Sequence, residues 1–376
     1  MQFGFDDDQT QLRRLARDFF TDRSPESTVR QLMMTEEGRD PAVWAELAQI
    51  GLLGLNVAEE FGGAGAGLTE VGIVAEEAGA ALLCAPWLAS AVLATGVLLH
   101  SGDPTAMKEF LPPMVAGERI ATLVLGLGSA TVDVGALGIR AEQRDGTWRL
   151  DGAEPYVLDA ESADLFLVAA TTAEGVSLFA VGSQTAGVSV TPQPPLDLTR
   201  RFAAVGLADV TARLIGEPGR AANAISRALD EAAAVLAMEQ VGAAQRVLEM
   251  AVGYAKVRFQ FGRPIGSFQA VQHTCADMLV EVECARSAAR YALWAAAHEP
   301  ADLPVAASVA QAYCSEAFVA VAGANIQVHG GIGFTWEHPA HLYFKRAAAD
   351  RALFGGPADH RARLVDLGAV TVPLQR

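Results

Sequence analysis

The chain has 376 residues, which suggests two or three domains, and 51% of its residues are apolar, enough for a large core. Its net charge of −16 argues against nucleic-acid binding, because proteins that bind nucleic acid present basic surfaces. No apolar run is long enough to span a membrane, and the acidic N-terminus lacks an apolar signal core. We therefore expect a cytoplasmic protein without a membrane span.

The first third of the chain has helical patterns. Capping oxygens at Asp6–Asp8 precede a segment in which Leu12, Leu15 and Phe19 recur at helical spacing. Further helices are predicted at 41–51, 69–83, 87–100 and 105–117. We assign residues 1–120 to an N-terminal α-helical domain.

The pattern then changes to short, β-rich segments bounded by Gly, Asp and Pro. They lie at 122–128, 138–143, 147–159, 163–171, 175–182 and 187–193. Between the second and third segments, Asp145 and Gly146 predict a tight hairpin turn. Residues 121–222 are therefore predicted to form a middle β domain.

Long helices return from residue 223. Residues 224–259 run for more than thirty positions without proline, and 275–297 and 305–330 predict two further long helices. Their alanine content on more than one side suggests burial in a bundle and at subunit contacts. We assign residues 223–376 to a C-terminal helical domain.

Two motifs in this last domain carry the most functional information. Tyr254–His273 reads YAKVRFQFGRPIGSFQAVQH, and Gln327–Gly333 reads QVHGGIG. An arginine guanidinium can hold phosphate oxygens bidentately, and glycine lets the backbone approach a ligand closely. The order and spacing of the two motifs closely resemble those of acyl-CoA dehydrogenases.

The resemblance covers essentially the whole chain and implies the fold of that family. This is an α+β architecture with an N-terminal α-helical domain, a middle β-barrel-like domain and a C-terminal four-helix bundle. In the family, the two motifs reach across a subunit interface and hold the FAD of a neighbouring subunit. The predicted FAD-binding residues, which we call the FAD clamp, are Arg258, Gln260, Phe261, Phe268, Gln327, Gly330 and Gly331.

The family desaturates an acyl-CoA thioester, using a glutamate that removes the Cα proton while flavin N5 accepts a hydride from Cβ. In a gap-free alignment from Gly330, Phe354 stands at the position of this glutamate, and phenylalanine cannot accept a proton. A minority of the family places the base on the long helix, at the position of Ala232. Glu231, next to it, and Glu239, two turns further on, are the candidate bases; otherwise we expect an exposed charge at Glu231 and a structural or interface carboxylate at Glu239.

The part of the family site that holds the flavin ring is also altered. Tyr156, Val157 and Leu158 stand where the family has Trp-Ile-Thr/Ser, and leucine offers no hydrogen bond to flavin N5. A loop that serves the flavin edge in the family is replaced by LGLGSATVD, residues 125–133, of which small residues such as Gly128 and Ser129 remain.

In the family, the base and the flavin-ring motif act within their own subunit, and both are altered here. The FAD clamp, which acts on the FAD of a neighbouring subunit, is intact. We expect the chain to be the FAD-clamping subunit of a heteromeric α2β2 enzyme, with a second acyl-CoA dehydrogenase-like subunit supplying the base. An electron-transfer flavoprotein-like acceptor is implied, and a sterol-derived or other bulky acyl-CoA is the expected substrate. Two alternatives stay open: a homotetrameric dehydrogenase with a non-standard base, and altered chemistry on a CoA or carrier-protein thioester.

Two other groups of residues could suggest different sites. Glu337, His338 and His341 invite a metal-site interpretation, but Pro339 interrupts their helical presentation and no third cluster supports them, so we predict no metal. His329 lies inside the glycine-rich motif and is interpreted as part of the FAD turn.

Overall fold

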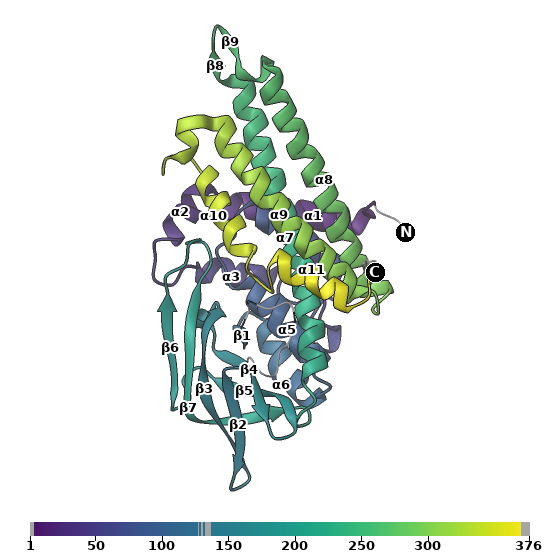
Figure 1. The fold of residues 1–376 in the computed structure, drawn as a ribbon. Coiled ribbons are helices and arrows are strands. Elements are labelled where there is room, and N and C mark those ends of the chain that lie inside the picture. The colour runs from purple at the N-terminus through teal and green to yellow at the C-terminus, as the bar shows by residue number, and fades with distance from the viewer. Residues whose placement is uncertain (1–3, 127, 129–130, 132–136, 370–376) are drawn as a thin grey trace, which may run out of the picture. The chain divides into compact units, whose positions relative to one another are not determined.

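The computed structural model describes residues 4–126, 128, 131 and 137–369, which form two compact units (Figure 1). The first, which we call the helical unit, comprises Met1–Arg30, Gly72–Leu83 and Ala233–Arg376. The second, which we call the β-containing unit, comprises Gln31–Val71 and Cys84–Ala232. Three helices, α2, α4 and α7, contribute residues to both units.

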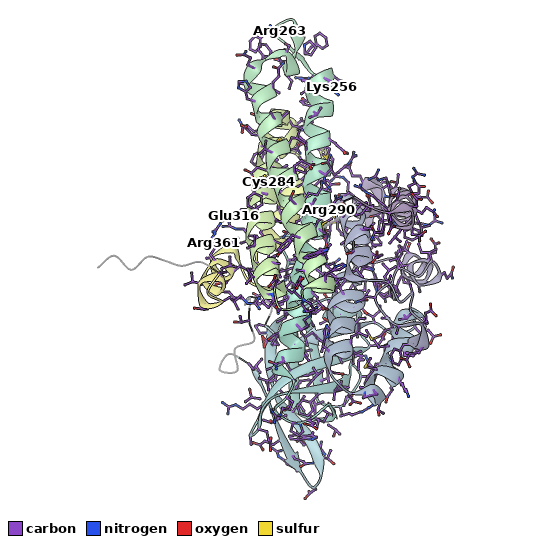
Figure 2. All side chains as sticks on the ribbon, turned by 90° about the vertical axis from the view of Figure 1, so that its right-hand side faces the viewer. Lys256, Arg263, Cys284, Arg290, Glu316 and Arg361 are labelled. Carbon is purple, nitrogen blue, oxygen red and sulfur yellow. The ribbon has the colours of Figure 1, made fainter. Side chains whose placement is uncertain are left out.

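The helical unit is built around three long helices. Its elements are α1 (Asp7–Arg23), α2 (Glu26–Leu32), α4 (Leu68–Ala80), α7 (Ala222–Val257), α8 (Gln269–His298), α9 (Leu303–His329), α10 (Ala340–Asp350) and α11 (Pro357–Asp366). The predicted start of α1 is present as a capping box. The Asp6 side chain accepts from Gln9 N, and the Gln9 side-chain oxygen accepts from Asp6 N. Lys256 and Arg263 lie at the end of the helical unit where α7 leads into α8 (Figure 2).

Helices α4 and α7 approach closely at two glycines. A Cβ on Gly79 would lie 2.0 Å from Glu239 O, and one on Gly242 would lie 1.7 Å from Glu76 O. Any larger residue would therefore push the two backbones apart. This contact fixes the middle of α7, the helix that leads to the predicted FAD clamp.

Helix α9 is the apolar centre of the bundle, in contact with α8, α10 and α11. Its segment Leu303–Phe334 is long and apolar enough to cross a membrane by length and composition alone, but 67% of its most apolar window is buried inside the structure. That burial is the behaviour of a core helix.

The β-containing unit begins with helices. These are α3 (Pro41–Gln49), the short helix η1 (Glu59–Phe61), the π-helix η2 (Leu88–Ala94), α5 (Thr95–His100) and α6 (Pro104–Val115). The helix predicted at 87–100 is thus π-helical in its first half. There Thr95 Oγ1 donates to Ser90 O, five residues back, at 2.9 Å.

The β domain is a closed barrel with two added strands. Its strands are β1 (Ala121–Val124), β2 (Ile139–Arg144), β3 (Thr147–Leu158), β4 (Leu165–Thr172), β5 (Gly175–Gly182), β6 (Val188–Gln193) and β7 (Phe202–Ile215). Antiparallel pairing joins β4 to β5, β5 to β7, β7 to β3 and β3 to β2, and a single parallel pair, Arg140 with Thr171, returns from β2 to β4. Strand β1 extends β4 in parallel, and β6 pairs with β7.

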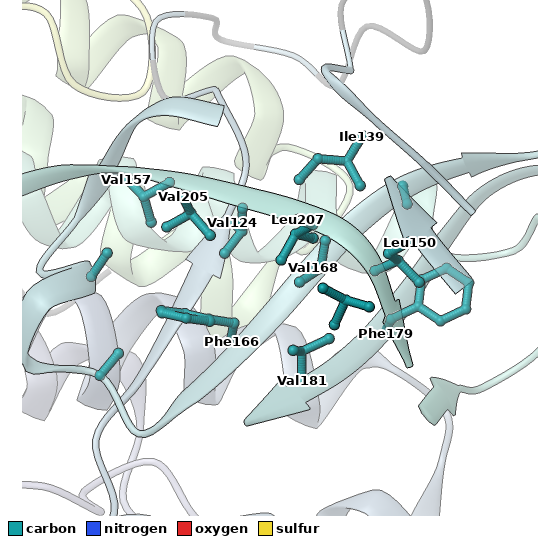
Figure 3. Packing of buried hydrophobic residues seen from close by; sticks show 14 of the residues in the cluster. Val124, Ile139, Leu150, Val157, Phe166, Val168, Phe179, Val181, Val205 and Leu207 are labelled. Carbon is teal, nitrogen blue, oxygen red and sulfur yellow. The ribbon is translucent and has the colours of Figure 1, made fainter. Parts of the chain in front are cut away.

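Apolar side chains from these strands fill the barrel. Phe166 and Val168 of β4 lie beside Phe179 and Val181 of β5, and β3 and β7 contribute further aliphatic residues (Figure 3). Each such side chain is fully or almost fully buried, which stabilises the fold by roughly 1.5–3 kcal/mol per residue. The barrel therefore has a core of its own.

Strand β7 lies where we predicted no element, although it is the longest strand of the barrel. Its buried positions Ala203, Val205 and Leu207 alternate as in a half-buried strand, but the alanines and Gly206 give a weak sequence pattern. The predicted hairpin between β2 and β3 is present. Asp145 and Gly146 have φ values of 50° and 78° and join the paired residues Arg144 and Thr147.

Candidate functional site

The first predicted FAD-binding segment forms a hairpin at the end of α7 and α8. Helix α7 ends at Val257, and Arg258 N donates to Tyr254 O at 2.9 Å. Strands β8 (Phe259–Gln260) and β9 (Arg263–Pro264) then pair, and η5 (Ile265–Ser267) leads into α8 (Figure 1). Phe261 and Gly262 form the turn with φ values of 52° and 78°, a geometry that a glycine in second position favours.

The side chains of this hairpin are presented outward. Arg258 and Gln260 are exposed, and Phe261 is 90% exposed. The Phe261 ring meets Phe268 edge-on with centroids 6.1 Å apart, and the Arg263 guanidinium lies 4.1 Å over the Phe268 ring. A phenylalanine this exposed at the tip of a hairpin suits contact with another molecule.

The second predicted segment begins where α9 ends. Gln327 is exposed in the last turn, Gly330 ends the helix with φ of 63°, and the short helix η6 (Gly330–Phe334) follows. A Cβ added to Gly330 or Gly331 would meet no atom of this chain within 4 Å. Packing within the chain therefore does not require a glycine at Gly331, and the bare backbone there is open to a ligand.

The structure brings the two segments together at one end of the helical unit. The ring of Tyr254, in the last turn of α7, stacks on His329 at the end of α9 with centroids 4.3 Å apart. An exposed guanidinium, two exposed amide side chains and an open glycine backbone thus belong to one region. This set fits a cofactor that carries phosphate groups, such as FAD.

Phe354, which the gap-free sequence alignment places at the position of the family base, is packed inside the helical unit. Its side chain is 1% exposed and its φ is 58°, an uncommon backbone conformation for a bulky residue. Gln311 Nε2 donates to Leu353 O at 3.1 Å, and His360 Nε2 donates to Phe354 O at 3.0 Å. Burial lowers the pKa of His360 to about 4, so this histidine is neutral at pH 7.

Glu231 is not the exposed charge that we expected as the alternative to a base. It is 9% exposed, and its carboxylate contacts His100 Nε2 at 2.9 Å and Arg227 Nε at 2.8 Å. Burial alone would raise the pKa of Glu231, but the hydrogen bonds and charges of His100 and Arg227 outweigh it and hold the pKa below its usual value. A carboxylate held in this way is a weak base.

Glu239 is buried in a different ion pair. Its Oε1 accepts from Arg346 Nη1 of α10 at 2.6 Å, and the two side chains are 7% and 2% exposed. The pairing is that of a structural carboxylate. Of these partners, only Arg227 could be read from the sequence, through its i, i+4 spacing to Glu231, because His100 and Arg346 lie far away along the chain.

The segment aligned with the flavin-ring motif lies at the end of β3. The Tyr156 side chain is 59% exposed, whereas Val157 and Leu158 are fully buried, and Leu158 O accepts from Thr122 Oγ1 at 2.7 Å. Nearby Glu154 is buried, and burial raises the pKa of its carboxyl group. Most of the loop at 125–133, including Ser129, falls outside the described residues.

Neither the histidine cluster around His338 nor the main cavity of the helical unit forms a further site with the predicted residues. Among the residues that the structure describes, no group of three or more His, Cys, Asp or Glu side chains could hold a metal ion; the His338 ring is tilted against His329, and His341 contacts Trp336. A cavity of about 550 Å³ opens between α1, α2, α4, α7 and α10. Arg13 and Arg17 in its wall are paired with Glu76 and Glu77, and no predicted site residue lines it.

Comparison with known proteins agrees with the resemblance drawn from the motifs. Residues 6–118 match the acyl-CoA dehydrogenase N-terminal domain, and residues 221–365 match the acyl-CoA dehydrogenase C-terminal domain. Acyl-CoA dehydrogenase IpdE2 of Mycolicibacterium smegmatis is 36% identical over 344 residues, which cover 91% of this chain and 92% of that protein.

Solved structures agree as well. A variant of the Tcur3481-Tcur3483 steroid ACAD aligns with a TM-score of 0.87 and 33% identity, over 96% of this chain and 98% of that chain. The ChsE4-ChsE5 complex from Mycobacterium tuberculosis aligns with a TM-score of 0.89 and 29% identity, over 99% and 100% of the two chains. The predicted fold class is therefore confirmed, and the chain belongs to the acyl-CoA dehydrogenase family of FAD-dependent oxidoreductases.

Proposed function

We propose that this chain is the FAD-clamping subunit of a heteromeric acyl-CoA dehydrogenase and does not supply the catalytic base. One observation carries the proposal: Phe354, which the sequence alignment places at the position of the family glutamate, is buried, whereas the clamp residues are kept and all but the half-buried Phe268 are exposed. The partner would be a second acyl-CoA dehydrogenase-like chain with an intact glutamate and flavin-ring motif. The expected assembly is α2β2.

The two carboxylates that could replace the missing base are both engaged elsewhere. Glu231 contacts His100 and Arg227, and Glu239 contacts Arg346. A general base needs a carboxylate free to reach the substrate proton, with a pKa near the working pH. These ion pairs favour the heteromer over a single-chain enzyme that uses either residue.

The clamp residues fit a role in binding FAD from a neighbouring subunit. Arg258 would hold the pyrophosphate by charge-assisted hydrogen bonds, and Gln260 and Gln327 offer amide donors and acceptors. Gly330 and Gly331 leave room for the cofactor to approach the backbone. When bound, FAD would supply the hydride acceptor of the desaturation, and this chain would orient it and shield it from water.

Names of the relatives suggest the kind of substrate and assembly. Tcur3481-Tcur3483 is a steroid ACAD named as a pair, and ChsE4-ChsE5 is named as a complex. We extend these properties to this chain and propose that the assembled enzyme acts on a sterol-derived or similarly bulky acyl-CoA. An electron-transfer flavoprotein-like acceptor would then reoxidise the flavin.

The clamp is tested in the co-expressed complex of this chain with an acyl-CoA dehydrogenase chain that carries the glutamate. Arg258→Ala should weaken FAD binding by about tenfold or more, because a hydrogen bond to a charged group contributes about 1.5–3 kcal/mol. Lys256→Ala is the matched control, because Lys256 is an exposed cation two residues away that the clamp does not include. Flavin absorbance per purified complex gives the result.

Loss of flavin only in Arg258→Ala supports the proposal. Full flavin content in Arg258→Ala would contradict it, because the complex would then hold FAD without the residue on which the clamp depends.

A further inference from the structure

Three aromatic rings, which we call the stack, lie against one another beneath the FAD clamp: Tyr254 and His329 are stacked, and His338 is tilted against His329. The His329 ring lies between Tyr254, at 4.3 Å and 28°, and His338, at 4.2 Å and 45°. Tyr254 belongs to the end of α7, His329 to the end of α9, and His338 to the residues just before α10. The stack therefore joins three segments that meet at the clamp.

Its position couples the two FAD-binding segments. The Tyr254 carbonyl accepts the hydrogen bond from Arg258 N at 2.9 Å, so the stacked residue also anchors the start of the hairpin. His329 lies between Gln327 and Gly330 in the chain and is 5% exposed. A shift of the His329 ring relative to Tyr254 would move Arg258 relative to the glycine turn.

The hydrogen bond of His338 requires a neutral ring, whereas that of His329 can form in either protonation state. His329 Nδ1 lies 2.9 Å from Asn325 O, so this nitrogen carries the proton and Nε2 need not. His338 Nδ1 accepts from Ala340 N at 3.2 Å, at the start of α10, and a protonated imidazole cannot accept this bond. Two imidazolium rings at this distance would also repel each other.

The charged groups around His338 provide no net negative charge that would stabilise its protonated form. Glu26 and Arg30 of α2 face His338 with opposite signs and are paired with each other at 2.7 Å, and His341 adds a further titratable ring. Lys345 lies near His341. Burial lowers the pKa of His329, and burial together with the neighbouring His329 lowers the pKa of His338.

We propose that His329 is a positioning residue for FAD: packed between Tyr254 and His338, it holds the Arg258 hairpin and the Gln327–Gly331 turn in one geometry. Protonation of the His338–His329 pair weakens these ring contacts, so that the two segments are no longer held in the geometry that binds FAD. The inference rests on the proposed FAD clamp. It adds Tyr254, His329 and His338, which lie outside the predicted clamp residues, and a dependence of FAD binding on pH.

The first test measures FAD affinity of the co-expressed complex at about pH 7.5 and about pH 5, by the fluorescence of released FAD. The native complex should bind FAD at least about tenfold more weakly at the lower pH. Tyr254→Phe keeps the ring and should behave like the native chain, whereas Tyr254→Ala and Tyr254→Leu should weaken binding at both pH values. His338→Asn keeps a short acceptor for Ala340 N and cannot be protonated, so it should remove most of the pH dependence.

Equal FAD affinity in Tyr254→Ala, Tyr254→Leu and Tyr254→Phe at both pH values would overturn the inference. So would an unchanged pH dependence in His338→Asn, since the titrating group would then lie elsewhere. A purely structural role of the stack would lower thermal stability in these variants and leave the pH profile of FAD binding as it is in the native complex.

The second test does not depend on FAD. Histidine ring resonances of this chain alone, labelled at its seven histidines, should show His329 and His338 titrating below their ordinary value and His329 moving back towards it in Tyr254→Ala. Ordinary titration of His329 in the native chain would contradict the stack itself. If the rings titrate as expected but the Arg258→Ala complex keeps its flavin, the ring contacts of the stack are supported and the proposed FAD clamp is contradicted.

Discussion

Glu239 of α7 and Arg346 of α10 form an ion pair of 2.6 Å inside the helical unit, with both side chains more than nine-tenths buried. Glu239 is also the residue whose backbone carbonyl meets Gly79 of α4 at close range. The same residue thus fixes α7 against two other helices. This explains a buried carboxylate on α7 without a catalytic role.

The first prediction concerns the stability that this pair provides. Glu239→Ala should lower the free energy of unfolding by about 3–5 kcal/mol, because it leaves the Arg346 charge buried with less compensation. Glu239→Gln should cost less, since its amide oxygen can still accept from the guanidinium. Urea denaturation followed by circular dichroism measures both.

The matched control is Glu249→Ala, which removes the partner of an exposed ion pair with Arg246 on the same helix. It should change the free energy of unfolding by less than about 1 kcal/mol. Equal changes in the free energy of unfolding at Glu239 and Glu249 would show that the buried pair stabilises the chain no more than an exposed pair does.

The second prediction separates a catalytic from a structural role at Glu231. Glu231→Gln should leave the turnover per bound flavin of the assembled complex unchanged, because its carboxylate is engaged with His100 and Arg227. The same change should lower thermal stability, since a partly buried salt-bridge partner is lost. A drop of about a hundredfold in turnover, within the range for loss of a general base, would mark Glu231 as the base after all.

The third prediction concerns Phe354. Phe354→Ala should destabilise the chain by about 3–5 kcal/mol through the cavity that it leaves, and Phe354→Leu should cost less. Neither should change turnover per bound flavin in the complex, because the proposed base belongs to the partner. Reduced turnover in Phe354→Leu without a loss of stability would place this segment in the active site.

The fourth prediction follows from the low pKa of His360. Its pKa is about 4 in the folded chain and 6.5 ordinarily, so the unfolded chain takes up the proton first as pH falls. The contribution to stability is fully present above pH 6.5 and is lost as pH falls towards 4. Within this window the free energy of unfolding should fall by up to about 1.4 kcal/mol per pH unit.

His360→Gln is the control for that pH dependence, because its amide can still donate to Phe354 O and does not titrate. Urea titrations at several pH values should give a flatter profile for this variant. Identical slopes in the native chain and the variant would assign the acid sensitivity to another group.

Local sequence patterns predicted the start of α1, the three long helices and the β2–β3 turn, because capping, periodicity and turn chemistry are encoded within a few residues. The start of α8 at Gln269, before the predicted residue 275, and the helices α2, α10 and α11 were missed. Strand β7 and the closure of the barrel were missed, since Ala203, Val205 and Leu207 become a strand only through pairing with distant β3, β5 and β6. The π-helical form of 88–94 had no signal that we recognised.

In the candidate site, too, local features were predicted and contacts between distant segments were missed. Motif order predicted which residues form the hairpin and the glycine turn, and their assignment to FAD stays a prediction. The Tyr254–His329–His338 stack and the pairing of His100 with Glu231 join residues from separate elements, so only the folded chain shows them.

The flavin-to-protein ratio separates a clamping subunit from an enzyme that is complete by itself. It is measured by visible absorbance for this chain purified alone and for the complex with a glutamate-bearing acyl-CoA dehydrogenase chain. We expect no bound flavin in the chain alone and one flavin per pair of unlike chains in the complex. One flavin per chain in the protein purified alone, with desaturation of an acyl-CoA, would contradict it.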